Sequence, residues 1–141
     1  MATVMKKNNS YRYPKTQREK IDGKRHYVFD KEKLPSVTTI LDVTQSAEKR
    51  EALANWRASK GEAEATRIVD ESGARGTAMH KILEMYILEQ GYMDETNVGK
   101  QAHNMAIQVI QSGLSNVTEY YGTECTLYYP GLYAGQTDLV G

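Results

Sequence analysis

The chain has 141 residues, which suits a single domain, and its 40% hydrophobic and 26% charged content is typical of a soluble globular protein. The one cysteine, Cys125, excludes an internal disulfide and favours a cytoplasmic setting. No apolar run is long enough to predict a membrane helix. The polar, basic start differs from a secretory signal. The net charge is +0, but residues 1–33 hold ten Lys and Arg against four Asp and Glu. This asymmetry suits a nucleic-acid partner for the basic part and a metal site in the acidic part, or else a solvated tail.

Residues 1–24 are polar, basic and poor in apolar side chains, so we expect a disordered or loosely attached arm. The domain itself is expected to cover residues 25–141. It starts with a short β-prone run, His26–Phe29, directly after the turn signal Asp22-Gly23. Ser36 is a natural N-cap, and the apolar repeat that follows it predicts a short helix.

Longer helices are expected in the middle of the chain. Residues 47–72 are strongly helical, and Lys60-Gly61 is expected to divide them into two helices. The run Gly73-Ala-Arg-Gly76 then predicts a break, after which Thr77 can cap a new amphipathic helix. A further helix is expected over residues 100–112.

The pattern changes to β after this last helix. Residues 117–129 are rich in β-branched and aromatic side chains, Pro130-Gly131 is a turn signal, and residues 132–140 predict a second strand. The two strands are expected to form an antiparallel hairpin. Helices followed by a hairpin indicate the α+β class.

Two places in this pattern carry side chains suited to metal chemistry. His80 and Glu84 are four residues apart on one helix, so they stack on one side of it, at the border of its apolar stripe. Asp138 brings a carboxylate on the last strand. In a hairpin closed at Pro130-Gly131, Glu124 and Asp138 can lie near one another on one face. Glu84 is interpreted either as a metal ligand, as a partner that orients His80, or as a surface charge.

Five motifs follow one another along the chain. They are Leu34-Pro-Ser-Val-Thr-Thr-Ile-Leu41, Leu53-x-x-Trp56, Arg75-Gly-Thr-x-x-His80-x-x-x-Glu84, Glu124, and Tyr133-Ala-Gly-x-x-Asp138. This ordered set resembles the PD-(D/E)XK nucleases, and it is most similar to RecB-like nuclease domains, the mitochondrial genome maintenance exonuclease and related phage exonucleases. The resemblance implies a restriction-endonuclease-like fold of which this sequence holds the N-terminal portion, a truncated form.

The resemblance also implies a mechanism. His80 and Asp138 would be catalytic residues that bind Mg²⁺ or Mn²⁺ beside the scissile phosphate of DNA, with Glu124 and Glu84 as further candidate ligands. Mg²⁺ prefers oxygen ligands, whereas imidazole suits Mn²⁺ better. The family signature continues with Asp/Glu-x-Lys on a following strand, which lies beyond Gly141. We therefore expect a second polypeptide to supply it and the chain alone to be inactive.

Three further residues are candidates for DNA binding. Ser36 and Thr38 are expected at a helix N-terminus, where they can hold a DNA phosphate, although simple capping explains Ser36 equally well. Arg75 can contact a phosphate or pair with Glu71, four residues earlier.

These observations favour the N-terminal part of a metal-dependent DNA exonuclease, located in the cytoplasm (that of a bacterial host if the protein is encoded by a phage). The alternative is a non-catalytic DNA-binding or subunit protein derived from the same fold. A helical scaffold protein without any nucleic-acid role is a third interpretation.

Overall fold

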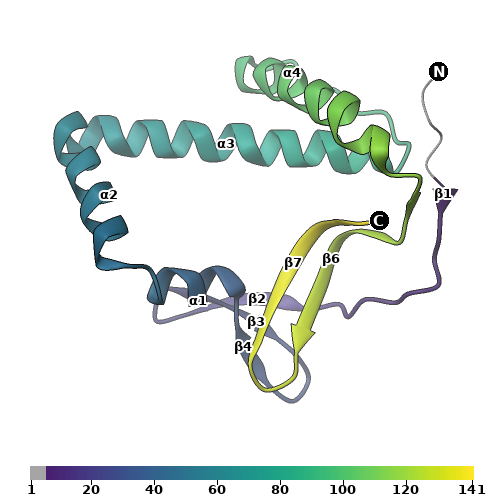
Figure 1. Cartoon of the computed structure of the whole chain (residues 1–141), viewed down its shortest axis with the longest axis horizontal. Coiled ribbons are helices and arrows are strands. Elements are labelled where there is room, and N and C mark those ends of the chain that lie inside the picture. The colour runs from purple at the N-terminus through teal and green to yellow at the C-terminus, as the bar shows by residue number, and fades with distance from the viewer. Residues whose placement is uncertain (1–5) are drawn as a thin grey trace.

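A computed structural model describes residues 6–141 of the chain and has 49% helix and 25% strand, which makes it a mixed α+β protein (Figure 1). The strands are β1 (Lys6–Lys7), β2 (Gln17–Ile21), β3 (Lys24–Val28), β4 (Lys33–Pro35), β5 (Glu119–Tyr120), β6 (Gly122–Tyr129) and β7 (Tyr133–Val140). The helices are α1 (Val37–Val43), α2 (Ala47–Lys60), α3 (Glu62–Ile87), α4 (Asn97–Ser112) and the 3-10 turn η1 (Leu114–Asn116). Within residues 6–141, no helix is long and apolar enough to cross a membrane.

The strands of the described part of the chain form three small sheets. β2, β3 and β4 make an antiparallel meander, β6 and β7 make an antiparallel hairpin, and β1 pairs in parallel with β5. The hairpin was expected from the sequence and is confirmed, with Tyr129 opposite Tyr133 next to its turn. Figure 1 shows α4 lying over α3, α2 leading from one end of α3 down to α1, and the hairpin running from beneath α3 to the meander.

The expected arm at residues 1–24 does not match the secondary structure. β2 lies inside this range and pairs with β3 through a turn at Asp22 and Gly23, whose φ angles are 53° and 76°. An Asp-Gly pair readily adopts such angles, so a hairpin forms although its strands are highly charged. β1 also lies in the range, whereas residues 1–5 of the expected arm fall outside the described residues.

The expected break before Thr77 is also wrong, because α3 continues without interruption from Glu62 to Ile87. Gly73 and Gly76 lie inside this helix. Each glycine costs about 1 kcal/mol in a helix interior relative to alanine. Packing against α4, where Ile82 is buried with Ala102 and Ala106, offsets this cost.

The other helix boundaries follow capping chemistry. Ser36 caps α1 and accepts a hydrogen bond from the Thr39 amide, as expected. The predicted division at Lys60-Gly61 is confirmed, since Gly61 has φ 85° between α2 and α3. The last helix starts earlier than residue 100, because Thr96 caps it by accepting from the Gly99 amide.

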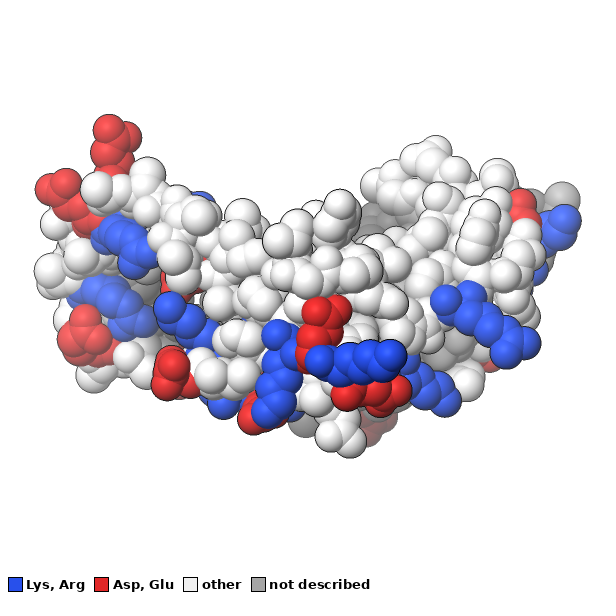
Figure 2. Space-filling model, turned by 90° about the horizontal axis from the view of Figure 1, so that it is seen from below, with Lys and Arg blue, Asp and Glu red and all other residues white. Residues whose placement is uncertain are grey.

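Within residues 6–141, buried apolar residues form two separate small clusters. In one, Tyr27 and Leu34 of the meander pack with Ala134 of β7; the other is the α3–α4 contact. Many large apolar side chains stay exposed, including Leu127, Tyr129 and Leu132 near the hairpin turn. Figure 2 shows one face on which charges of both signs are mixed and a broad area carries no charge.

Candidate metal centre

The fold brings His80 of α3 next to Asp138 of β7. The Nδ1 atom of His80 lies 3.1 Å from the Oδ1 atom of Asp138, a hydrogen bond that joins the helix to the end of the hairpin. Both side chains are exposed, at 46% and 66%, so a ligand can reach them from solvent. The two residues are 58 positions apart in sequence, and their meeting therefore depends on the whole of the intervening fold.

Glu124 completes a cluster of three potential ligands. The pairs Thr123–Leu139 and Cys125–Thr137 flank the position where Glu124 lies across the hairpin from Asp138. One ligand atom each from His80, Glu124 and Asp138 lies within 4.8 Å of the others. The proximity of Glu124 to Asp138 that the hairpin geometry suggested is therefore present.

The backbone of Glu124 is strained. Its φ angle is 51°, in the left-handed region that a non-glycine residue seldom adopts. The side chain of Gln136 supports this conformation, because its Nε2 atom donates to the Glu124 carbonyl oxygen at 3.1 Å. Strain of this kind costs about 1–3 kcal/mol and tends to occur at ligand-binding and catalytic positions.

The pKa of Glu124 is affected by its surroundings. Burial raises the pKa of Glu124 above its ordinary value, and the charges of Asp138 and Glu84 raise it further. His80 and Arg18 lower the pKa of Glu124 and so oppose part of this rise. A cation bound beside the Glu124 carboxylate would stabilise its charged form, because the positive charge offsets the repulsion from the neighbouring carboxylates.

The donor set fits a divalent cation that accepts both oxygen and nitrogen. Asp138 and Glu124 each offer carboxylate oxygens, as Mg²⁺ and Mn²⁺ require, and His80 offers an imidazole nitrogen, which suits Mn²⁺ better than Mg²⁺. Glu84 lies in the wall of two cavities that also include His80 and Glu124. Glu84 therefore lies next to the cluster, and its carboxylate is 3.9 Å from the Lys81 ammonium group.

Of the two DNA-binding candidates at α1, Ser36 is buried and Thr38 is exposed. Ser36 is only 2% exposed, and its hydroxyl lies within hydrogen-bond distance of both the amide and the hydroxyl of Thr39. Capping thus accounts for Ser36. Thr38 is exposed and lines a cavity of about 650 Å³ that also includes Glu124 and Asp138.

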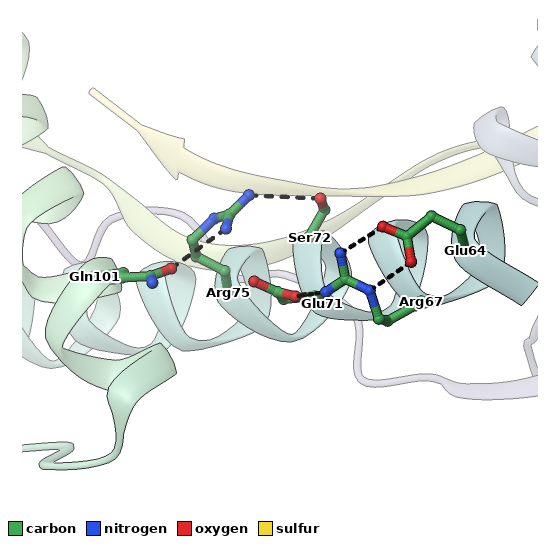
Figure 3. Close-up of polar contacts among 6 residues, drawn as sticks. All are labelled: Glu64, Arg67, Glu71, Ser72, Arg75 and Gln101. Atoms are coloured by element: carbon green, nitrogen blue, oxygen red, sulfur yellow. Dashed lines mark hydrogen bonds and ion pairs between the residues drawn. The ribbon is translucent and has the colours of Figure 1, made fainter. Parts of the chain in front are cut away.

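Arg75 serves as a link between helices. Its guanidinium donates to Gln101 of α4 at 3.3 Å and to Ser72 at 3.4 Å (Figure 3). The alternative pairing of Arg75 with Glu71 does not occur, because Arg67 binds Glu71 at 2.7 Å and Glu64 at 2.8 Å. Arg75 is thus engaged on the side of α3 that meets α4.

Sequence reasoning missed Arg18 and Gln136. Arg18 of β2 hydrogen-bonds to Gln136 of β7 and lines a cavity with His80 and Glu124. Arg18 fell inside the expected arm, and the only signal that pointed to a strand there was the turn pair Asp22-Gly23. His103 of α4 is half-buried, and its Nε2 atom accepts a hydrogen bond from the Asp94 amide at 3.0 Å.

Comparison of the chain with protein-family models, with curated proteins and with solved structures finds no match.

Proposed function

We propose that this protein is part of a metal-dependent DNA exonuclease of the PD-(D/E)XK class. The observation that carries the proposal is the cluster of His80, Glu124 and Asp138, whose ligand atoms lie within 4.8 Å of one another. These residues come from a helix and both strands of a hairpin, in the order in which the family motifs occur. A helical histidine beside an exposed strand carboxylate is the arrangement that the resemblance implies.

The residues would divide the chemistry as follows. A bound divalent cation would neutralise developing charge on the phosphate and lower the pKa of the attacking water. Asp138 and Glu124 would provide its anionic oxygen ligands, and His80 a neutral nitrogen ligand. Glu84, next to the cluster, would accept a hydrogen bond from a coordinated water.

Hydrolysis by this class also uses an Asp/Glu-x-Lys segment. We propose that residues 1–141 alone bind the metal but degrade DNA poorly until a polypeptide segment with this motif is supplied. The nearest lysine in the α3 sequence, Lys81, is paired with Glu84 at 3.9 Å. That pairing favours the second candidate function, a non-catalytic DNA-binding or subunit protein.

The decisive experiment mixes the chain with a polypeptide that carries Asp/Glu-x-Lys and measures degradation of linear DNA with Mg²⁺ or Mn²⁺. Asp138→Ala is expected to abolish activity, because the metal loses an anionic ligand. His80→Ala is expected to cost less and to shift the preference away from Mn²⁺. Asp70→Ala, which removes an exposed carboxylate from the same helix, is the matched control and should keep full activity.

Two results would contradict the proposal. Full activity of the Asp138→Ala mixture would overturn the assignment to this class. Binding of DNA by the chain without activity in any mixture would favour the non-catalytic alternative. In both cases the affinity of the chain alone for Mn²⁺, measured by electron paramagnetic resonance, shows whether the cluster holds a metal.

A further inference from the structure

A cavity of about 470 Å³ lies directly beside the proposed metal centre. It is lined by His80 and Glu124 of the cluster and by Glu84, Thr77, Gly73, Gly76, Arg18 and Lys81. Two walls therefore carry a cation each, Arg18 from β2 and Lys81 from α3. A cavity that joins two cations to a group of carboxylates is suited to an anionic ligand that shares a divalent metal with those carboxylates.

Arg18 is held in position by contacts to two other strands. Its guanidinium donates to the side-chain oxygen of Gln136, two residues before Asp138, and lies 6.0 Å from the centre of the Tyr27 ring. Gln136 in turn donates to the Glu124 carbonyl. A guanidinium has five N–H donors, so the bond to Gln136, the single side-chain hydrogen bond of Arg18 among residues 6–141, leaves most of its donor capacity for a ligand.

The side of α3 that lines the cavity includes two glycines. Gly73, Gly76 and His80 follow one another at spacings of three and four residues, which places them along one side of the helix. A Cβ atom built on either glycine meets no other heavy atom within 4 Å. A side chain at either position would therefore meet no neighbour, and its absence leaves the cavity open.

We infer that Arg18 and Lys81 bind a phosphodiester group of a nucleic acid strand that passes over Gly73 and Gly76 to the metal centre. Arginine matches the geometry of phosphate oxygens with two parallel N–H groups, whereas lysine acts as a point charge. Arg18 is then the principal phosphate contact. Lys81 is the weaker one, because its ammonium group also pairs with Glu84. This inference rests on the proposed function, because it assigns the substrate side of the same site.

The first test measures binding of a short fluorescent single-stranded oligonucleotide to the full chain by anisotropy, with Ca²⁺ present to prevent cleavage. Arg18→Gln is expected to weaken binding roughly tenfold or more, because a charged hydrogen bond to phosphate is lost. It should also reduce the slope of log K against log salt by about one. Lys81→Gln should have a smaller effect in the same direction. Lys20→Gln, on the same strand but outside the cavity lining, is the control and should bind nearly as the parent does.

The second test separates a binding role from a structural role. Gly76→Ala and Gly76→Leu should raise the thermal midpoint, because both replace glycine by a better helix former in open space. Gly76→Leu should nevertheless weaken oligonucleotide binding severalfold by filling the cavity. Parent-like binding by either Arg18→Gln or Gly76→Leu would overturn the inference.

Mn²⁺ binding to the same variants distinguishes this inference from the proposed function. Arg18→Gln and Gly76→Leu should bind Mn²⁺ as the parent does, whereas Asp138→Ala should not. A parent chain that binds no Mn²⁺ would refute the metal centre itself. Normal Mn²⁺ binding together with unchanged oligonucleotide affinity in Arg18→Gln would refute only the phosphate contact.

Discussion

At the scale of single residues, Glu124 combines a strained backbone with a ligand side chain. Its φ of 51° destabilises the fold, and a glycine at this position would remove that strain. Glycine also loses more conformational entropy on folding, which cancels part of the gain. Glu124→Gly is therefore expected to be about 1 kcal/mol more stable than Glu124→Gln, which corresponds to roughly 3 °C in thermal midpoint. Both variants should lose Mn²⁺ affinity.

The comparison of these two variants isolates the backbone effect. Each removes the carboxylate and its repulsion by Asp138, but only glycine relieves the left-handed conformation. Equal thermal midpoints in calorimetry would show that the conformation of Glu124 carries no strain.

A second residue-scale prediction concerns Asp94, ahead of α4. Its carboxylate accepts hydrogen bonds from the Thr96 hydroxyl at 2.6 Å and the Thr96 amide at 3.0 Å. These bonds, and more weakly the charge of His103, lower the pKa of Asp94 below its ordinary value of 3.8, although burial acts in the opposite direction. The charged form is the one that the folded state stabilises. This contribution is present above pH 3.8 and is lost as the pH falls through the lowered pKa.

Urea denaturation of the parent and of Asp94→Asn at several pH values checks this prediction. The stability difference between them should be largest near neutral pH and should shrink in acid. A difference that does not change with pH would show that the Asp94 carboxylate makes no charge-dependent contribution to folding.

At the scale of elements, the start of α4 has no room for a side chain. A Cβ atom at Gly99 would clash with both the side chain and the carbonyl oxygen of Asp94. Gly99→Ala is expected to destabilise the protein by about 1–3 kcal/mol, because either the helix cap or the loop must move. Gly91→Ala, where a Cβ meets nothing within 4 Å, is the control and should leave the thermal midpoint nearly unchanged.

Local chemistry predicted most of the elements. The Ser36 cap, the division at Gly61 and the β6–β7 hairpin all depend on residues close in sequence, and all three are present. The predicted break at Gly73–Gly76 failed because packing between α3 and α4 outweighs the preference of two glycines. β2 was missed because its polar sequence has no strand pattern, and the strand is stabilised by pairing with β3.

The same distinction applies to the site. The proximity of His80, Glu124 and Asp138 could be expected from the sequence, because they lie in the motifs that resemble those of a nuclease family and because one hairpin turn fixes the relation of Glu124 to Asp138. The contact of Arg18 with Gln136 joins residues 118 positions apart. No spacing rule reaches across such a distance, so only the folded chain could reveal it.

At the scale of the whole molecule, β7 has an incompletely covered edge. β6 pairs with one side, and among the described residues the other side has a single bridge, from Ala134 to Ser36. Exposed apolar side chains lie near the hairpin turn, with Tyr129 and Leu132 each 57% exposed. Open strand edges beside apolar surface promote association. We therefore expect the isolated chain to oligomerise as its concentration rises.

Light scattering over a concentration series measures this association. Tyr129→Lys should reduce it, because a charge near the edge opposes pairing, whereas Tyr92→Lys in the loop before α4 should not. A parent chain that remains monomeric at high concentration would contradict the prediction.

The parallel pair of β1 and β5 has a consequence for the order of events during synthesis. Asn8, next to β1, donates to Glu119 of β5 across 111 positions of sequence. At the usual pace of translation, on the order of 10 s separates the emergence of these two strands. Throughout that interval the meander and helices can fold, while β1 must wait for its partner. The nascent chain thus keeps a basic segment available to other molecules until β5 has been made.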